Sequence, residues 1–271
     1  MKPSTGSRGW DEYAAFYDWE NQRTVGRRDI AFWRRFAAGI SGRALELGTG
    51  TGRVLVPLSR AARAGSPPPA VFGVDLSAAM LARARARFRR AKLPIRAARG
   101  DIRALPYRAS SFGAVIAPYG IIQSLTSDAD LEAALGEAAR VLKKGGCAIV
   151  RGPNYFCFFE GHYRMFWFPM MGDSAFARFY LKIMKRPFEG LKTFHPVNPL
   201  KLRKYAREAG FKFVNIKRKQ IYDGAKRRFP VLNGFLGILG LPAIYIGWET
   251  LQYIKNTAVS GVPLEYLLIK E

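Results

Sequence analysis

The feature that most limits the fold of this chain of 271 residues is a set of three glycines at every second position. They lie between a short apolar strand pattern and a helical pattern. Residues 45–53 read LELGTGTGR. Glycines at such a junction let the backbone turn sharply and let a ligand approach the main chain closely. A Walker A loop is excluded because no Gly-Lys-Ser/Thr follows, and the third glycine comes too early for the dinucleotide fingerprint. The loop therefore predicts a ligand site of another kind at the end of a strand.

Strand and helix patterns alternate over residues 44–151. Strands are expected at 44–47, 71–75, 95–99, 114–117 and 147–151, and helices at 53–64, 77–92 and 128–142. The hydroxyl of Ser77 is expected to cap the second helix by accepting from a free backbone amide. Strands separated by helices indicate βαβ units, and hence an α/β fold with a parallel sheet covered on both faces.

The chain after residue 152 is less regular. Residues 155–194 contain 13 aromatic side chains in 40 positions, against 13% aromatic residues in the whole chain. A helix is expected at 198–209, followed by extended segments at 211–221 and 262–270 that should pair at one edge of the sheet. Between them, the 20 residues 229–248 carry no charged side chain.

The glycine loop resembles motif I of the class I S-adenosylmethionine (SAM)-dependent methyltransferases. That motif has an acidic residue two positions before the first glycine, where this chain has Glu46. The resemblance implies that the loop residues in contact with SAM are Glu46, Gly48, Thr49, Gly50 and Gly52. Glu46 would serve the cationic amino group of the methionine part, and the loop amides its carboxylate.

Two acidic residues further along the chain fit the same family. Asp75 ends the second expected strand, where the family has an acid that accepts both ribose hydroxyls. A carboxylate suits this role because its two oxygens can accept from two O–H donors together. Asp101 follows the third strand, where the family has an acceptor for the adenine amino group beside an apolar residue, here Ile102, that packs on the ring. Leu76, directly after Asp75, belongs to the same predicted cofactor site.

Two further segments resemble the family with one departure each. Residues 111–116 (SFGAVI) are similar to its S-F-D-x-V strand, with Gly113 in place of the usual aspartate. Residues 139–146 (ARVLKKGG) are similar to its R-V-L-K-P-G-G turn, with Lys144 at the proline position. The resemblance implies a Rossmann-like, doubly wound seven-stranded sheet, mostly parallel with an antiparallel last strand, plus aromatic and hydrophobic helical insertions.

An upstream Tyr13-x-x-x-Tyr17-Asp18 pattern resembles the N-terminal lid segment of many such enzymes, in which tyrosines cover the cofactor. Tyr17 is therefore included among the predicted SAM contacts. The alternative is that aromatic residues four positions apart simply pack along one helix face.

The acceptor side of the site is less defined. Tyr119 follows the fourth strand, where acceptor-facing residues lie in the family, but the Asn/Asp-Pro-Pro-Tyr pattern of DNA amino-methyltransferases is absent. The chain has two histidines, His162 and His195, and each fits either a general base or a structural role. Tyr119 and His162 are the candidate acceptor-site residues. The two cysteines match no zinc spacing, and no metal site is predicted.

Four segments are expected along the chain. They are an N-terminal helical lid segment (1–40), a SAM-binding core (41–152), an aromatic substrate-cover insertion (153–197) and a C-terminal part of the core (198–271) with a hydrophobic hairpin insertion at 229–256. A dense aromatic cover suits a lipophilic or planar acceptor, and a small satellite core is the alternative. The length of the uncharged segment also suits a membrane span, which is the remaining alternative. The hairpin is expected to pack on the protein or to dip into one membrane leaflet, because the strands on its two sides should pair with each other and because prolines and glycines interrupt it.

The formal net charge of +24 is spread along the chain. Residues 1–152 hold 25 basic and 12 acidic groups, and residues 153–271 hold 19 and 8. Basic residues flank the uncharged segment, which favours an anionic membrane surface over nucleic acid as a partner. The first ten residues lack the apolar run of a signal peptide, so we expect a cytoplasmic protein, peripheral at the inner face of the membrane.

These observations predict methyl transfer from SAM to a small, lipophilic or aromatic acceptor. The first alternative is an RNA methyltransferase whose basic surface contacts phosphates, and the second is a non-catalytic SAM-fold binding protein. The oligomeric state stays open.

Overall fold

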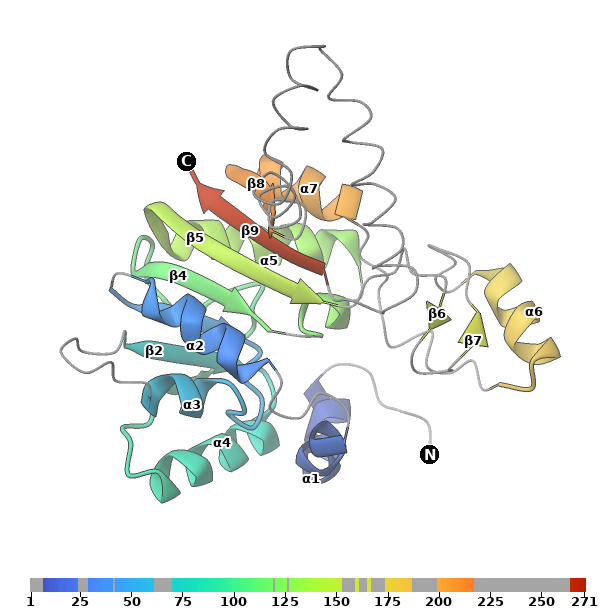
Figure 1. Cartoon of the computed structure of the whole chain (residues 1–271), viewed down its shortest axis with the longest axis horizontal. Coiled ribbons are helices and arrows are strands. Elements are labelled where there is room, and N and C mark those ends of the chain that lie inside the picture. The colour runs from blue at the N-terminus through green and yellow to red at the C-terminus, as the bar shows by residue number, and fades with distance from the viewer. Residues whose placement is uncertain are drawn as a thin grey trace, which may run out of the picture.

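Figure 1 shows the computed structural model of the whole chain. The structure describes residues 7–23, 29–40, 42–60, 70–118, 120–125, 127–152, 159–160, 165–166, 174–186, 199–216 and 264–271. The predicted hydrophobic hairpin at 229–256 lies outside the described residues, as does most of the aromatic insertion. Within the described part of the chain, no helix is long and apolar enough to cross a bilayer.

The elements of the first half alternate as the periodicity predicts. They are α1 (Ser7–Arg23), α2 (Ile30–Ala38), β1 (Ala44–Leu47), α3 (Leu55–Arg60), β2 (Val71–Asp75), α4 (Ala78–Arg90), β3 (Ala97–Arg99) and β4 (Phe112–Ala117). The predicted cap of α4 is confirmed, since Ser77 Oγ accepts from the amide of Met80 at 3.1 Å.

The second half contains shorter and more varied elements. They are the 3-10 turn η1 (Ile122–Ser124), α5 (Asp128–Val141), β5 (Leu142–Gly152), β6 (Phe159–Glu160), β7 (Met165–Phe166), α6 (Ala175–Ile183), α7 (Pro199–Glu208), β8 (Phe211–Asn215) and β9 (Leu264–Lys270). β5 begins earlier than the predicted residue 147. Leu142 pairs with Phe112 and Cys147 pairs with Ala114, so the lysine–glycine run between them bulges where the register shifts, with Gly145 at a φ of +73°.

The seven-stranded sheet has the order β3-β2-β1-β4-β5-β9-β8. The first five strands are parallel, and β9 is antiparallel to both β5 and β8. This confirms the predicted mostly parallel sheet and the predicted pairing of the last two extended segments. The strand order reverses between β1 and β4, and ligands of such sheets bind at the carboxyl ends of the strands beside this point.

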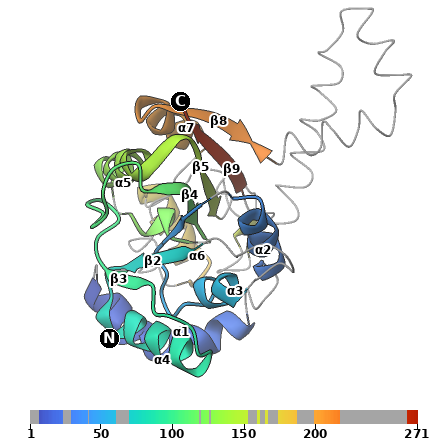
Figure 2. The same ribbon diagram turned by 90° about the vertical axis from the view of Figure 1, so that its left-hand side faces the viewer.

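Helices cover both faces of the sheet (Figures 1 and 2). One face packs against α2, α3 and α4 through a core that includes Trp33, Leu55, Phe88, Ala114 and Ile116. The other face packs against α5 and α7 through Leu131, Leu135, Val115, Leu202 and Leu268, among others. Neighbouring residues of β4 thus serve opposite cores, as strand alternation requires.

Candidate cofactor and acceptor site

The glycine loop joins β1, in the middle of the sheet, to α3. Gly48, Gly50 and Gly52 have φ angles of +61°, +54° and +77°, a region that favours glycine over residues with a Cβ. A Cβ added at Gly48 would also collide with the side chain of Ile121, which follows β4. The loop therefore packs closely against the segment after β4, at the carboxyl ends of two neighbouring strands.

Asp75, the last residue of β2, is tied to this loop. Its Oδ2 accepts from the amide of Gly50 at 2.7 Å, and its Oδ1 accepts from the amide of Ser77 at 2.9 Å. Burial raises the pKa of Asp75, and the two amide donors partly offset that effect. The carboxylate is thereby held in one orientation beside the loop.

Glu46 lies beneath the same loop with a relative exposure of 2%. It accepts a hydrogen bond of 3.1 Å from the Thr49 hydroxyl. Burial raises the pKa of Glu46 to about 8, although the Thr49 hydroxyl and the Arg53 charge act in the opposite direction. Arg53 is itself engaged by Asp29, with hydrogen bonds of 2.6 and 2.9 Å. A buried carboxyl of this kind is suited to a cationic ligand group.

Helix α1 is attached to the glycine loop through Asp18. This carboxylate accepts from the Thr51 hydroxyl at 2.6 Å and pairs with Arg87 of α4 at 2.7 Å. A Cβ added at Gly50 would lie 3.9 Å from the ring of Tyr17, so this tyrosine faces the loop. Burial raises the pKa of Tyr17.

A second carboxylate of α1, Asp11, holds the helix at the start of α4. It accepts from the Ser77 hydroxyl at 2.5 Å and from the amide of Ala79 at 3.0 Å. The hydrogen bond from Ser77 lowers the pKa of Asp11. Both views show α1 alongside α4. The N-terminal helix is therefore anchored at the loop and at the residues that follow Asp75.

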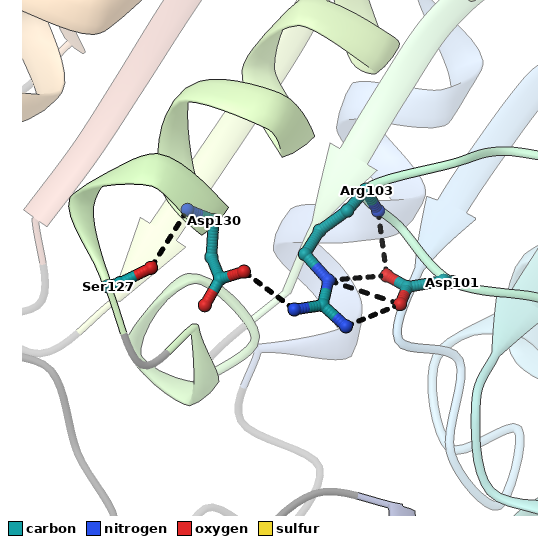
Figure 3. A network of polar contacts seen from close by, with 4 residues as sticks. All are labelled: Asp101, Arg103, Ser127 and Asp130. Atoms are coloured by element: carbon teal, nitrogen blue, oxygen red, sulfur yellow. Dashed lines mark hydrogen bonds and ion pairs between the residues drawn. The ribbon is translucent and has the colours of Figure 1, made fainter.

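Asp101 follows β3 and forms a close pair with Arg103 (Figure 3). Its oxygens accept from the Arg103 backbone amide at 2.9 Å and from Nη2 at 2.7 Å. The other guanidinium arm reaches Asp130 in the first turn of α5 at 2.6 Å. The hydrogen bond from Arg103 lowers the pKa of Asp101, so the carboxylate stays ionised.

Apolar residues flank these acids. Leu76 is 40% exposed beside Asp75, whereas Ile102 is buried beside Asp101. The structure thus places the predicted residues on neighbouring strand ends and loops in the order β1, β2 and β3. Tyr119 and His162, the predicted acceptor-site residues, lie outside the described residues.

Comparisons with known proteins agree with this arrangement. A family model described as a methyltransferase domain matches residues 44–146. A demethylmenaquinone methyltransferase of Roseiflexus castenholzii is 31% identical over 206 residues, covering 69% of this chain and 76% of that protein. The chain belongs to the class I SAM-dependent methyltransferases. A second protein of that name, from Thermus thermophilus, is 35% identical over 146 residues, which span 52% of this methyltransferase and 62% of the relative.

Solved structures show the same fold. A phosphoethanolamine N-methyltransferase 2 from Haemonchus contortus, in complex with SAM, matches with a TM-score of 0.55 and 20% identity over 97% of this chain and 58% of that chain. A putative sarcosine dimethylglycine methyltransferase from Galdieria sulphuraria matches with a TM-score of 0.56 and 16% identity over 97% and 98% of the two chains.

The donor set of the methyltransferase fits its cofactor, SAM. The buried Glu46 carboxyl lies beside the glycine loop, where an ammonium group could ionise it, and only the ring of Tyr17 comes within 4 Å of the position that a Cβ would take at Gly50. Asp75 has its carboxylate fixed by amides, an arrangement that leaves further lone pairs for hydroxyl donors.

Sequence reasoning missed several residues of this site. Asp11, Ile121 and Arg103 belong to no motif, and Asp18 was noted without a role. Their partners lie far away along the chain, as for Asp11 and Ala79, which are 68 positions apart. Only the pattern Tyr17-Asp18 gave a signal for one of them.

Proposed function

We propose that this methyltransferase acts on a small, lipophilic aromatic acceptor of the quinone class in its reduced, hydroxylated form. The observation that carries the proposal is the match to two proteins named demethylmenaquinone methyltransferases, one of which aligns over 76% of its length. Such an acceptor is consistent with the aromatic composition of residues 153–197, the proposed substrate cover.

SAM supplies an activated sulfonium methyl group when it is bound. In the proposed site Glu46 receives the ammonium group, Asp75 receives the ribose hydroxyls, and the loop with Gly48, Thr49, Gly50 and Gly52 lies against the methionine part of the cofactor. The amides of Thr49, Gly50 and Gly52 already donate within the protein, so they shape the loop. The task of the protein is mainly to hold the acceptor in line with the methyl group at close range.

The adenine end of the proposed site is formed by two loops. Asp101 accepts from the adenine amino group, while Leu76 and Ile102 contact the ring faces. Tyr17 covers the cofactor from α1, so that residues 1–40 serve as a lid on the core of residues 41–152. Tyr119 and His162 are proposed acceptor-side residues, and residues 198–271 complete the core.

We also propose peripheral contact with an anionic membrane, from which a lipophilic acceptor would enter. Helix α6 supports this proposal, because it exposes Phe176, Phe179 and Ile183 to between 53% and 60% and continues into the exposed Met184. Two exposed basic side chains of the helix, Arg178 and Lys182, lie on the adjoining arc, and the exposed Lys185 and Arg186 follow its end. Apolar and basic faces side by side suit a helix lying in the interface of an anionic bilayer. Figure 1 shows α6 beyond the end of the sheet at which β5 ends.

Methyl-labelled SAM tests the acceptor class directly. The protein is incubated either with a demethylmenaquinone reduced to its hydroquinone or with total RNA. Label is expected in the organic phase of the first reaction and absent from the RNA of the second. Gly50→Arg serves as the inactive control, because φ is +54° there and the side chain would meet Tyr17. Label in RNA, or no label in the quinone fraction, overturns the proposal.

A further inference from the structure

Gln123 is a buried polar residue that the cofactor site does not use. It lies in η1, just after β4, and its relative exposure is 4%. Its Oε1 has no hydrogen-bond partner among the described residues. A buried acceptor without a partner destabilises the folded state, so its presence calls for a physical explanation.

Gln123 lies at the carboxyl ends of the sheet strands, on the same side as the glycine loop. Ile121, two residues before it, is the side chain that an added Cβ at Gly48 would strike. On the other side, β5 ends at Gly152, and a Cβ added there would collide with the Gln123 amide. The amide therefore occupies space that Gly152 leaves open, at the carboxyl ends of the neighbouring strands β4 and β5.

The chemistry of the unpaired Gln123 Oε1 indicates which kind of group would pair with it. An amide oxygen accepts hydrogen bonds, so its partner must carry an O–H or N–H donor. No described side chain supplies that donor to Oε1. A ligand that enters beside the glycine loop would supply it, and would replace an unpaired buried acceptor by a paired one.

We infer that Gln123 is an acceptor-binding residue whose Oε1 receives a hydrogen bond from a ring hydroxyl of the methyl acceptor, with Gly152 providing the space for its amide. The inference rests on the proposed function, since a reduced quinone carries such a hydroxyl. The interaction fixes the rotation of the ring and favours the reduced, hydroxylated form over a form that lacks the donor.

Two ligands test the inference, one that carries ring hydroxyl donors and one in which they are replaced by methoxy groups. Binding of 1,4-naphthohydroquinone, kept reduced, and of 1,4-dimethoxynaphthalene is measured by calorimetry with the protein saturated with S-adenosylhomocysteine. The unchanged protein should prefer the hydroquinone by about tenfold, the value of one hydrogen bond. Gln123→Met, which keeps the length of the side chain, should remove this preference and leave binding of S-adenosylhomocysteine unchanged.

Thermal stability distinguishes a role of Gln123 in acceptor binding from a purely structural role. Since Gln123→Met removes an unpaired buried acceptor, its melting temperature should equal or exceed that of the unchanged protein. Gly152→Ala should displace the flexible amide and reproduce the lost preference by a different route. If both variants still prefer the hydroquinone, the inference about Gln123 is overturned and the proposed function is not affected. If the unchanged protein binds neither compound and does not methylate the reduced demethylmenaquinone, the proposed function fails with it.

Discussion

The backbone amide of Gly50 donates a 2.7 Å hydrogen bond to Oδ2 of Asp75, linking the loop after β1 to the end of β2. Both residues belong to the proposed cofactor site, Gly50 through the close approach that its backbone allows and Asp75 through its carboxylate. The hydrogen bond makes them a single unit, because the shape of the loop and the orientation of the acid depend on each other.

Replacing Asp75 by Asn should therefore weaken binding of S-adenosylhomocysteine by about 10- to 100-fold. The amide loses the negative charge and one of the two acceptor oxygens, and charged hydrogen bonds contribute more than neutral ones. Titration calorimetry gives the dissociation constant. Asp128→Asn is the matched control, since its carboxylate pairs with Lys201 at 2.9 Å on the α5–α7 side. Equal affinities of Asp75→Asn and the control would remove Asp75 from the site.

The pKa of about 8 at Glu46 predicts proton release on cofactor binding. Near pH 7 the buried carboxyl is largely protonated, and the ammonium group of SAM should ionise it by lowering its pKa. Calorimetry at pH 7 in buffers of different ionisation enthalpy should show close to one proton released. Glu46→Gln should release none and bind SAM at least tenfold more weakly.

Glu46 also gives the stability of the free protein a pH dependence with a definite sign. Its pKa rises from 4.5 to about 8 on folding, so the folded state holds more protons between these values. The free energy of unfolding should therefore fall as pH rises from about 4.5 to 8. Glu46→Gln should reduce that slope, as measured by denaturant unfolding at pH 5 and pH 8. An unchanged slope would contradict the raised pKa.

Arg103 should act on cofactor recognition through Asp101. Arg103→Met removes the guanidinium that orients the carboxylate, so discrimination between S-adenosylhomocysteine and S-inosylhomocysteine should fall by roughly 3- to 10-fold. Inosine lacks the amino donor that a carboxylate recognises. Arg108→Met, which changes an exposed arginine in the same loop, should keep the full discrimination. If Arg103→Met keeps it as well, Asp101 does not need its partner.

Asp18 should control how firmly α1 covers the glycine loop. Asp18→Ala removes the partner of Thr51 and Arg87, so amide hydrogen exchange in α1 should become faster and S-adenosylhomocysteine should bind several-fold more weakly. Phe16→Ala changes a side chain of the same helix that is 64% exposed, and it should leave both measurements unchanged. Normal exchange in Asp18→Ala would show that other contacts hold the helix.

The apolar face of α6 should decide membrane binding. A double change, Phe179→Ser with Ile183→Ser, should lower co-sedimentation with phosphatidylglycerol vesicles about tenfold or more, because burial of each side chain contributes roughly 1.5–3 kcal/mol. Leu200→Ser is the control, as this leucine of α7 is 67% exposed. Equal retention of both variants, or no retention of the unchanged protein at low salt, would remove α6 from the proposal.

Local sequence patterns were enough to predict the strands and helices of the core and the position of the glycine loop. These features depend on short-range information: apolar periodicity marks β1, β2 and α5, and the Ser77 hydroxyl caps α4 within its own first turn. Glycines spaced by two at a strand end are equally local. The expected pairing of the last two extended segments with each other is confirmed by β8 and β9.

Contacts between distant side chains depend on the folded arrangement of the elements. Asp11 and Ser77 are 66 positions apart, and Arg103 and Asp130 are 27 apart, so no spacing in the sequence announces either contact. The early start of β5 depends in the same way on pairing with β4. Gln123 is the clearest case, because an unpaired buried acceptor is defined by everything packed around it, which the sequence pattern of η1 does not contain.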